Sequence, residues 1–288
     1  MRSRLLKPTL LHVLLAVGGI TMILPFLWMV STSLKPEEQI FRFPPVWIPR
    51  TWEWGNYTEA MQAANFGRYF INTVIYAGAV TISNLLLCSM AAYAFARLRF
   101  RGREVLFILV LGTMMIPGQV TMVPVFIMLK HWPLFGGNDW LGSGGHGLLN
   151  SYPGLVLPSA VGAFGIFLLR QFFRTLPREL EDAARIDGCS EAGIYWRIIL
   201  PLSGPALATL GIFTFTAAWN EFLWPLLITS RDSMKTLQVG LQVFQTQYTT
   251  NWDLLMAGTV VVTIPVLILF LAGQRYFTRG IALSGIKG

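Results

Sequence analysis

The chain has 288 residues, of which 54% are hydrophobic and only 12% are charged. A soluble domain usually carries about 25% charged residues, and the mean hydropathy here is +0.56. These values exclude a disordered chain, a fibrous repeat and an ordinary soluble enzyme, and they indicate a protein that resides in lipid. The net charge of +8 comes from basic residues scattered between apolar runs, so nucleic-acid binding is not expected.

The core of a bilayer needs about 20 apolar residues of helix. Six long runs contain no Asp, Glu, Lys or Arg except for Glu221 in the fifth. The runs are 9–31, 71–96, 105–129, 148–169, 202–229 and 254–274. As helices they would satisfy their own backbone polar groups, as the bilayer demands. Pro117, Pro124 and Pro265 break the helical pattern and are either kinks that line a cavity or tolerated bends. We therefore expect an all-α integral membrane protein that forms one domain over 1–288.

The basic residues orient these spans. The loops 1–8, 97–104, 170–201 and 275–288 hold most of the Lys and Arg residues, so both termini are predicted to be cytoplasmic. On the other side, 32–70 is rich in proline and tryptophan and is predicted to be a folded loop. The glycine-rich segment 131–147 is predicted to be flexible. The two cysteines, Cys88 and Cys189, cannot form a disulfide framework and are expected to be free thiols.

The loop at 175–201 has the pattern of two short helices. Pro177 suits the first turn of the first helix, acidic residues follow it, and Gly188 suits its C-terminal turn. Ser190 can cap the second helix, which Pro201 is expected to end before the fifth span. The pattern alone leaves two alternatives open, an interfacial amphipathic linker and a docking site for a soluble partner.

The same loop resembles the permease subunits of bacterial ATP-binding-cassette importers, which share the pattern E-A-A-x3-G-x9-I-x-L-P. This chain has Asp182-Ala183-Ala184, then Gly188, then Ile198-x-Leu200-Pro201. Asp182 replaces the usual glutamate, and Glu181 precedes it. The string Trp219–Leu226 and the basic C-terminus from Arg279 to Gly288 resemble the carbohydrate-importing branch, of the maltose-transporter type.

The resemblance implies a six-span type I importer fold in the bacterial inner membrane, and it implies several partners. These are a second and different permease subunit, two ATPase subunits that bind ATP and Mg²⁺, and an extracytoplasmic solute-binding protein that delivers a sugar or oligosaccharide. The short helix around 178–188 would occupy a cleft of one ATPase subunit and couple its closure to the spans. The contact residues would be Glu181, Asp182, Ala183, Ala184, Asp187 and Gly188.

The chain itself is expected to bind no cofactor or metal and to contain no catalytic residue. The sequence contains no Walker A pattern, so this chain cannot bind ATP in that way. Its three histidines, His12, His131 and His146, are far apart in the sequence, and no metal cluster is implied.

One carboxylate, Glu221, falls inside a predicted span, where an ionisable group needs a partner or water. One interpretation places Trp219, Asn220, Glu221 and Trp224 on the translocation path, with a tryptophan stacked on a sugar ring. The other places Glu221 near the outer interface within an ordinary aromatic belt.

Three alternatives to a sugar importer subunit differ in what they require. A polyol or glycerol phosphate is the second choice of substrate, and a phosphate ester would favour a basic residue in the path. A stand-alone secondary transporter would predict more charges within the spans and two repeated halves. A membrane enzyme would need a cluster of ionisable or metal-binding residues near one interface.

Overall fold

The computed structural model describes residues 2–246 and 248–284, and the regular structure of these residues is helical apart from one isolated β-bridge between Gln245 and Thr250. The all-α class is therefore confirmed. Contacts divide the chain into two compact units, one of Met1–Gly67 with Gly240–Ile264 and one of Arg68–Val239 with Pro265–Gly288. Lys287 and Gly288 of the C-terminal pattern lie outside the described residues. The single membrane domain over 1–288 and the side on which the termini lie stay predictions.

The first unit is built on α1 (Arg2–Ser33) and a folded segment that follows it. The segment contains α2 (Glu37–Ile40) and α3 (Gly55–Gln62), and the unit also contains η4 (Leu241–Phe244) and the start of α15 (Trp252–Ser284). The Asn56 amide donates to the carbonyls of Ser33 and Lys35, at 3.1 and 3.0 Å, and so satisfies polar groups at the end of α1. The Lys35 ammonium lies 4.0 Å from the ring centroid of Trp28.

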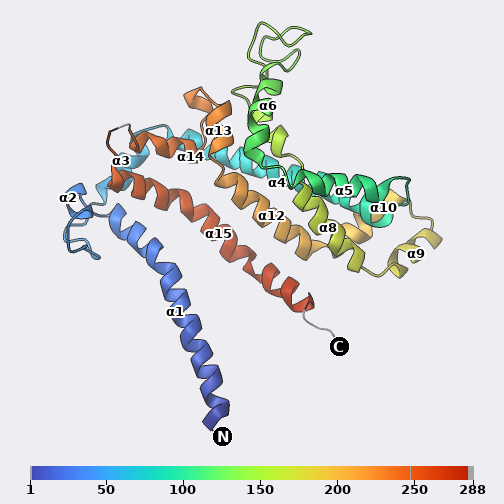
Figure 1. Ribbon diagram of the computed structural model, residues 1–288, viewed down its shortest axis with the longest axis horizontal. Coiled ribbons are helices and arrows are strands. Elements are labelled where there is room, and N and C mark those ends of the chain that lie inside the picture. Colours follow the sequence, from blue (N-terminus) through green and yellow to red (C-terminus); the bar gives the residue numbers. More distant parts are fainter. Residues whose placement is uncertain (1, 247, 285–288) are drawn as a thin grey trace. The chain divides into compact units, whose positions relative to one another are not determined.

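The second unit contains most of the helices (Figure 1). In chain order they are α4 (Phe66–Arg97), α5 (Arg103–Thr113), α6 (Gly118–Lys130), α7 (Tyr152–Val156), η1 (Leu157–Ser159), α8 (Ala163–Thr175), α9 (Glu179–Ile186), α10 (Glu191–Ile194), η2 (Tyr195–Ile199), α11 (Leu200–Leu202), α12 (Gly204–Trp219), α13 (Leu223–Ile228), η3 (Asp232–Met234) and α14 (Leu237–Gly240). Its core packs α4, α8, α10 and α12 together around Cys88, Leu169, Phe173, Ile194 and Leu210.

Within the described part of the chain, three helical stretches are long and apolar enough to cross a membrane without interruption: Leu11–Ser33, Phe66–Arg97 and Trp252–Gln274. Three further pairs pass the same test of length and composition only when each bent pair is counted as one span. The bends are 97° between α5 and α6, 48° between η1 and α8, and 77° between α11 and α12. The predicted runs 105–129, 148–169 and 202–229 are therefore not single straight helices.

Proline accounts for only one of the suspected interruptions. Pro117 lies at the break before α6, where its ring sets the backbone conformation that precedes the helix. Pro124 and Pro265 lie inside α6 and α15, which continue through them. The break after α12 contains no proline and lies at Asn220–Phe222.

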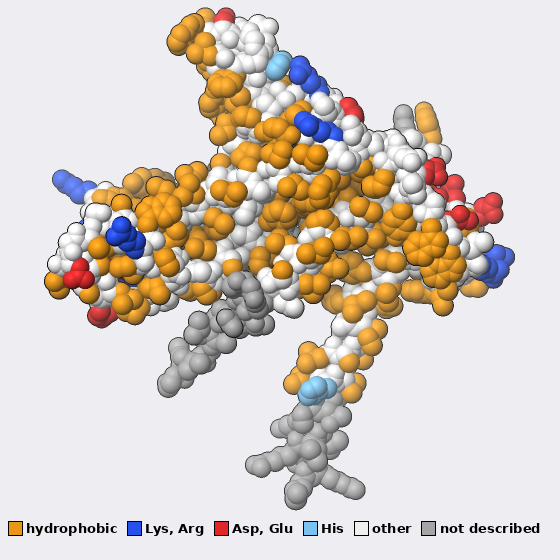
Figure 2. All heavy atoms as spheres, turned by 180° about the vertical axis from the view of Figure 1, so that it is seen from behind, with side chains coloured by type: hydrophobic (Ala, Val, Ile, Leu, Met, Phe, Trp, Pro, Cys, Tyr) orange, Lys and Arg blue, Asp and Glu red, His pale blue; other side chains and the backbone are white. Residues whose placement is uncertain are grey.

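Hydrophobic side chains cover most of the face shown in Figure 2, and charged side chains form only small groups. None of the apolar window in α1 is buried inside the structure. Exposed apolar surface of this extent is unstable in water but is matched by lipid or by another membrane subunit.

The glycine-rich segment 131–147 is not the flexible loop that the sequence predicts, because polar side chains close it on itself. The Asn138 amide donates to the carbonyls of Lys130 and Trp132, and its oxygen accepts from the Gly145 N–H at 2.8 Å. The Asp139 carboxylate accepts the N–H groups of Leu141 and Ser143, each at 2.8 Å. The glycines serve close backbone contacts within this ordered loop.

Gly142→Ala should lower the free energy of unfolding by at least about 1 kcal/mol. Gly142 has a φ of +76°, and a Cβ there would lie 2.0 Å from the carbonyl oxygen of His131. Gly112→Ala is the matched control, because Gly112 lies within α5 and a Cβ there would meet nothing within 4 Å. Thermal unfolding in detergent should show a loss for the first variant and none for the second. Equal midpoints would contradict the ordered loop.

Candidate functional site

The loop at 175–201 folds as the sequence predicts in most respects. The helix α9 (Glu179–Ile186) has acidic residues in its first turn and Arg185 in its last, which matches the helix dipole at both ends. Gly188 follows the helix with a φ of +80°, the left-handed conformation that favours glycine. Pro177 differs from the prediction, since it lies two residues before the first helical residue and not in the first turn.

The second half of the loop is longer than predicted. The Ser190 hydroxyl accepts the N–H of Gly193 at 3.2 Å and so caps α10, as expected. The helix then continues through the π-helical turn Tyr195–Ile199 and through Pro201 to Leu202. Pro201 therefore does not end it. The interruption comes at Ser203, where the 77° bend into α12 begins.

Of the six predicted contact residues, which lie in α9 and directly after it, two are buried and four are exposed. Glu181 and Ala184 point into the unit, with 2% and 7% of their surface exposed. The other four are exposed: Asp182, Ala183, Asp187 and Gly188. Only these four are positioned to touch a partner without unfolding the loop.

Two exposed apolar side chains on α9 were not singled out from the sequence. Ile186 is 87% exposed and Leu180 is 44% exposed. Ile186 lies four residues after Asp182 and three after Ala183, so these three share one helical face. A single exposed apolar side chain is common on protein surfaces, so Ile186 is of interest only because it shares a face with Asp182 and Ala183 of the motif. The i, i+3, i+4 spacing from the motif is the signal that identifies it.

Arg185 organises the charges of this loop. Its guanidinium forms ion pairs with Asp182 at 2.8 Å and Glu191 at 2.9 Å, and it lies 3.6 Å from Glu181. Burial raises the pKa of the Glu181 carboxyl, and the positive charges of Arg97 and Arg185 oppose that shift. The hydrogen bond to Glu191 raises the pKa of Arg185, so this guanidinium stays charged. A polar cavity of about 590 Å³ lies beside these groups.

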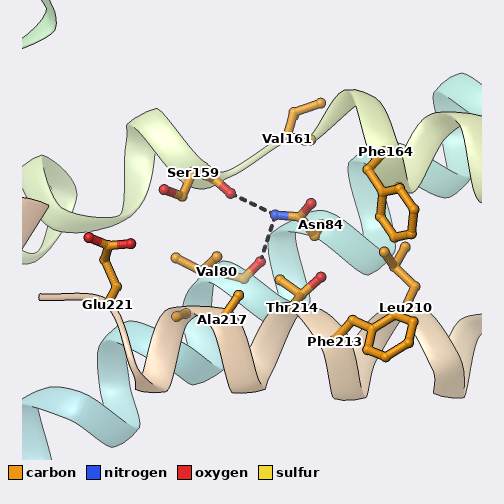
Figure 3. Close-up of a pocket in the computed structure, with 13 residues that line it drawn as sticks. Val80, Asn84, Ser159, Val161, Phe164, Leu210, Phe213, Thr214, Ala217 and Glu221 are labelled. Carbon is orange, nitrogen blue, oxygen red and sulfur yellow. Dashed lines mark hydrogen bonds between the residues drawn. The ribbon is translucent and has the colours of Figure 1, made fainter. Parts of the chain in front are cut away.

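A second site lies where two helix breaks meet (Figure 3). A cavity of about 410 Å³ is lined mostly by apolar side chains of α4, α8 and α12, with Asn84 and Glu221 among its polar groups. The Asn84 amide donates to the carbonyls of Val80 and Ser159, at 3.1 and 2.6 Å, so it joins α4 to the η1 segment. Glu221 projects from the break after α12 toward the same segment.

Glu221 also lines a neighbouring cavity of about 320 Å³ together with Gln119, Met122, Pro158 and Trp224. Its carboxylate accepts the backbone N–H of Trp224 at 3.2 Å, which satisfies a free donor at the start of α13. Glu221 therefore has a structural contact and also faces two cavities.

The other three predicted path residues, Trp219, Asn220 and Trp224, each make contacts inside the unit. Trp219 is 1% exposed and packs against Phe70 and Phe215. Trp224 is 7% exposed, and its ring N–H donates to the carbonyl of Leu155 at 3.3 Å. The Asn220 amide donates to Thr216 and accepts from Gln238. Both tryptophans are buried in the unit, and Trp224 also lines the cavity that Glu221 shares with Gln119. A place for these residues on the translocation path stays a prediction.

These features define a multi-span membrane protein that carries a short helix with an exposed face and a carboxylate at a helix break. Residues 84–283 match the family described as the binding-protein-dependent transport system inner membrane component. The chain belongs to this family and is a permease of the ATP-binding-cassette importers, located in the inner membrane.

Relatives of known name cover almost the whole chain. The arabinooligosaccharides transport system permease AraQ of Halalkalibacterium halodurans is 37% identical over 92% of this chain and 91% of its own length. The sn-glycerol-3-phosphate transport system permease UgpE of Yersinia pestis is 34% identical over 95% of each. A crystal structure of a bacterial transporter that imports the acidic polysaccharide alginate matches with a TM-score of 0.80 and 25% identity, over 96% of this chain and 98% of that one.

A further solved structure has the same fold at 15% identity, with a TM-score of 0.66 over 95% of this chain and 96% of that one. It is an alginate transporter in complex with a periplasmic protein that holds an alginate pentasaccharide. At this identity the likeness shows the fold alone.

Trp224→Phe should destabilise the protein by about 1 kcal/mol, the usual value of one neutral hydrogen bond, because the carbonyl of Leu155 loses its donor. If Trp224 acts only through this hydrogen bond, the apparent affinity for the transported solute should not change, although the residue lines the cavity at Glu221. Trp140→Phe is the matched control, because Trp140 is 79% exposed. Thermal unfolding and uptake at varied solute concentration measure the two effects. A changed solute affinity with unchanged stability would place Trp224 on the translocation path.

Proposed function

We propose that this chain is one of two permease subunits of a sugar or oligosaccharide importer and that α9 docks on an ATPase subunit. The exposed face of α9 carries the proposal, because Asp182, Ala183 and Ile186 offer a carboxylate, a small residue and an apolar anchor together. An interface of this kind buries an apolar centre within a polar rim. A lipid-facing linker would instead place its apolar residues on one continuous stripe.

The partners follow from the same family. A second permease subunit would complete the pathway, and two ATPase subunits would hold ATP and Mg²⁺. A solute-binding protein would deliver the sugar from outside. This chain would bind no cofactor and perform no catalysis, and its role would be a rigid-body change of the spans when the ATPase subunits close. A stand-alone transporter and a membrane enzyme do not fit the family to which the chain belongs.

A neutral polyhydroxyl solute is supported over a phosphate ester. The cavities at Glu221 are lined largely by apolar side chains, their polar side chains include amide, hydroxyl and carboxylate groups, and none of their lining residues is lysine or arginine. A phosphate or uronate next to Glu221 would be repelled, whereas a sugar hydroxyl can donate to it. The relative named for arabinooligosaccharides points to the same class of substrate, and the one named for glycerol-3-phosphate gives the alternative.

The docking of α9 predicts a change in the reactivity of Cys189. Cys189 is half-buried beside Gly188, whereas Cys88 is fully buried and serves as an internal control. A maleimide should label Cys189 when the chain is extracted alone and should label it much more slowly in the complex with ATPase subunits. Mass spectrometry of each cysteine peptide measures the rates. Equal labelling of Cys189 in both forms would contradict docking at this loop.

Two substitutions distinguish a structural role of Glu221 from direct contact with the solute. Glu221→Gln keeps an oxygen that can accept the N–H of Trp224 but removes the charge, whereas Glu221→Ala removes both. If the carboxylate contacts the solute, Glu221→Gln should reduce uptake about fivefold, because a hydrogen bond to a charged acceptor exceeds a neutral one by about 1 kcal/mol. Uptake in proteoliposomes measures this. Normal uptake by Glu221→Gln, with loss only in Glu221→Ala, would leave the carboxylate with its structural contact alone.

A further inference from the structure

Three polar side chains on one face of α4, spaced four residues apart, contact the loop at 175–201. The Ser89 hydroxyl lies 2.7 Å from the hydroxyl of Tyr195. One turn further on, the Tyr93 hydroxyl donates to the Glu191 carboxylate at 2.6 Å. After another turn, Arg97 forms an ion pair with Glu181 at 2.7 Å. The spacing places all three on the same side of α4.

The last of these contacts is the most sheltered. The side chains of Arg97 and Glu181 are each 3% exposed. Arg97 also donates to the carbonyl of Leu176 at 2.7 Å, in the segment that leads from α8 into α9. A buried charge that loses its partner is strongly unfavourable, so the pair holds α9 and its approach segment against the end of α4.

Packing reinforces the same contact. Ala92 and Ala96 on α4 are 0% and 6% exposed, and their small side chains belong to one cluster with Ala184, Ile194 and Tyr195 of the loop. Short side chains let helices approach closely, and a close-packed contact transmits a displacement without compressing.

The chain changes direction on both sides of the loop. After α8 the backbone turns extended at Leu176, with a ψ of 140°, before α9 begins. Beyond the loop, α11 and α12 meet at the 77° bend. Chain breaks of this kind can act as hinges, because a few residues absorb the change in backbone angle. The loop is thus flanked along the chain by two changes of direction, whereas three polar side-chain contacts join it to α4.

We propose that Ser89, Tyr93 and Arg97 are positioning residues that transmit the displacement of α9 to the span α4, and that Glu181 serves as the internal partner of Arg97 and does not contact the ATPase subunit. This inference rests on the proposed docking of α9. It assigns the two adjacent acidic residues different roles, with Glu181 inside the chain and Asp182, whose side chain is 66% exposed, on the docking face.

The test compares Glu181→Gln with Asp182→Asn in the complete transporter, reconstituted in proteoliposomes with its solute-binding protein. Both variants replace a carboxylate by the amide of the same size. Glu181→Gln should retain the ATPase subunits on purification and hydrolyse ATP, but the solute moved per ATP should fall about tenfold, the scale of coupling between two sites. Asp182→Asn should weaken retention of the ATPase subunits. Loss of those subunits in Glu181→Gln, or an unchanged solute-to-ATP ratio, would overturn the proposal.

Two further variants keep the test valid if Glu181→Gln fails to fold. Tyr93→Phe removes only a hydroxyl and should also lower the solute moved per ATP while the ATPase subunits remain bound. The charge exchange Arg97→Glu with Glu181→Arg should restore part of the ratio that either single change loses. No rescue, together with a normal ratio in Tyr93→Phe, would show that these contacts only stabilise the fold.

The outcome for Asp182→Asn separates this proposal from the one on which it rests. If Asp182→Asn and Ile186→Ser both retain the ATPase subunits with wild-type affinity, docking through this face is wrong, and the transmission through α4 falls with it. If both weaken retention while Glu181→Gln and Tyr93→Phe keep the wild-type solute-to-ATP ratio, docking holds and only the role of α4 is overturned.

Discussion

Charged groups that are sheltered from water must be paired, and this constraint organises one end of the second unit. Arg97 pairs with Glu181 and joins α4 to α9. Arg170, 5% exposed, pairs with Glu104 at 2.9 Å and lies 3.8 Å from the ring centroid of Phe107, which joins α8 to α5. Two arginines thus hold four helix ends together. Arg97 and Arg170 belong to the set of basic residues that predicts the orientation of the spans, and their ion pairs also join helices of the fold.

The helix breaks also expose backbone polar groups inside the spans. In a continuous helix these groups would be hydrogen-bonded to one another. The cavity at Glu221 lies where the break after α12 faces the η1 segment before α8. At both breaks side chains satisfy groups that the helices leave free, with Glu221 on the N–H of Trp224 and Asn84 on the carbonyl of Ser159. Residues that cap a break are therefore also the polar lining of the cavity, so their structural and functional roles cannot be separated by position alone.

Local features of the site were predictable from the sequence because they depend on backbone rules. The helix after Pro177, the left-handed Gly188 and the cap at Ser190 all follow from such rules. The direction in which each side of α9 points was not predictable. The sequence of an eight-residue helix does not show which face will be buried. For α9 that depends on Arg97, the partner of Glu181, which lies on α4 and far away along the chain.

For the glycine-rich segment 131–147 the prediction from composition was wrong. Composition predicts flexibility there, because glycine is permissive. That reasoning counts backbone freedom but not close contacts: at Gly147 a Cβ would lie 2.3 Å from the carbonyl oxygen of Leu129, so the same residue type also allows a tight turn. The amide of Asn138 and the carboxylate of Asp139 then fix the turn. A polar side chain that can bond to nearby backbone is the signal that separates an ordered glycine loop from a flexible one.

The replacement of the usual glutamate by Asp182 is explained by the geometry of α9. A shorter carboxylate has less reach, but Arg185 lies three residues on and holds it at 2.8 Å. The partner would therefore meet a carboxylate that is already oriented, which reduces the conformational entropy lost on docking. Adjacent residues of a helix point about 100° apart, so Glu181 faces the buried Arg97 while Asp182 remains at the surface.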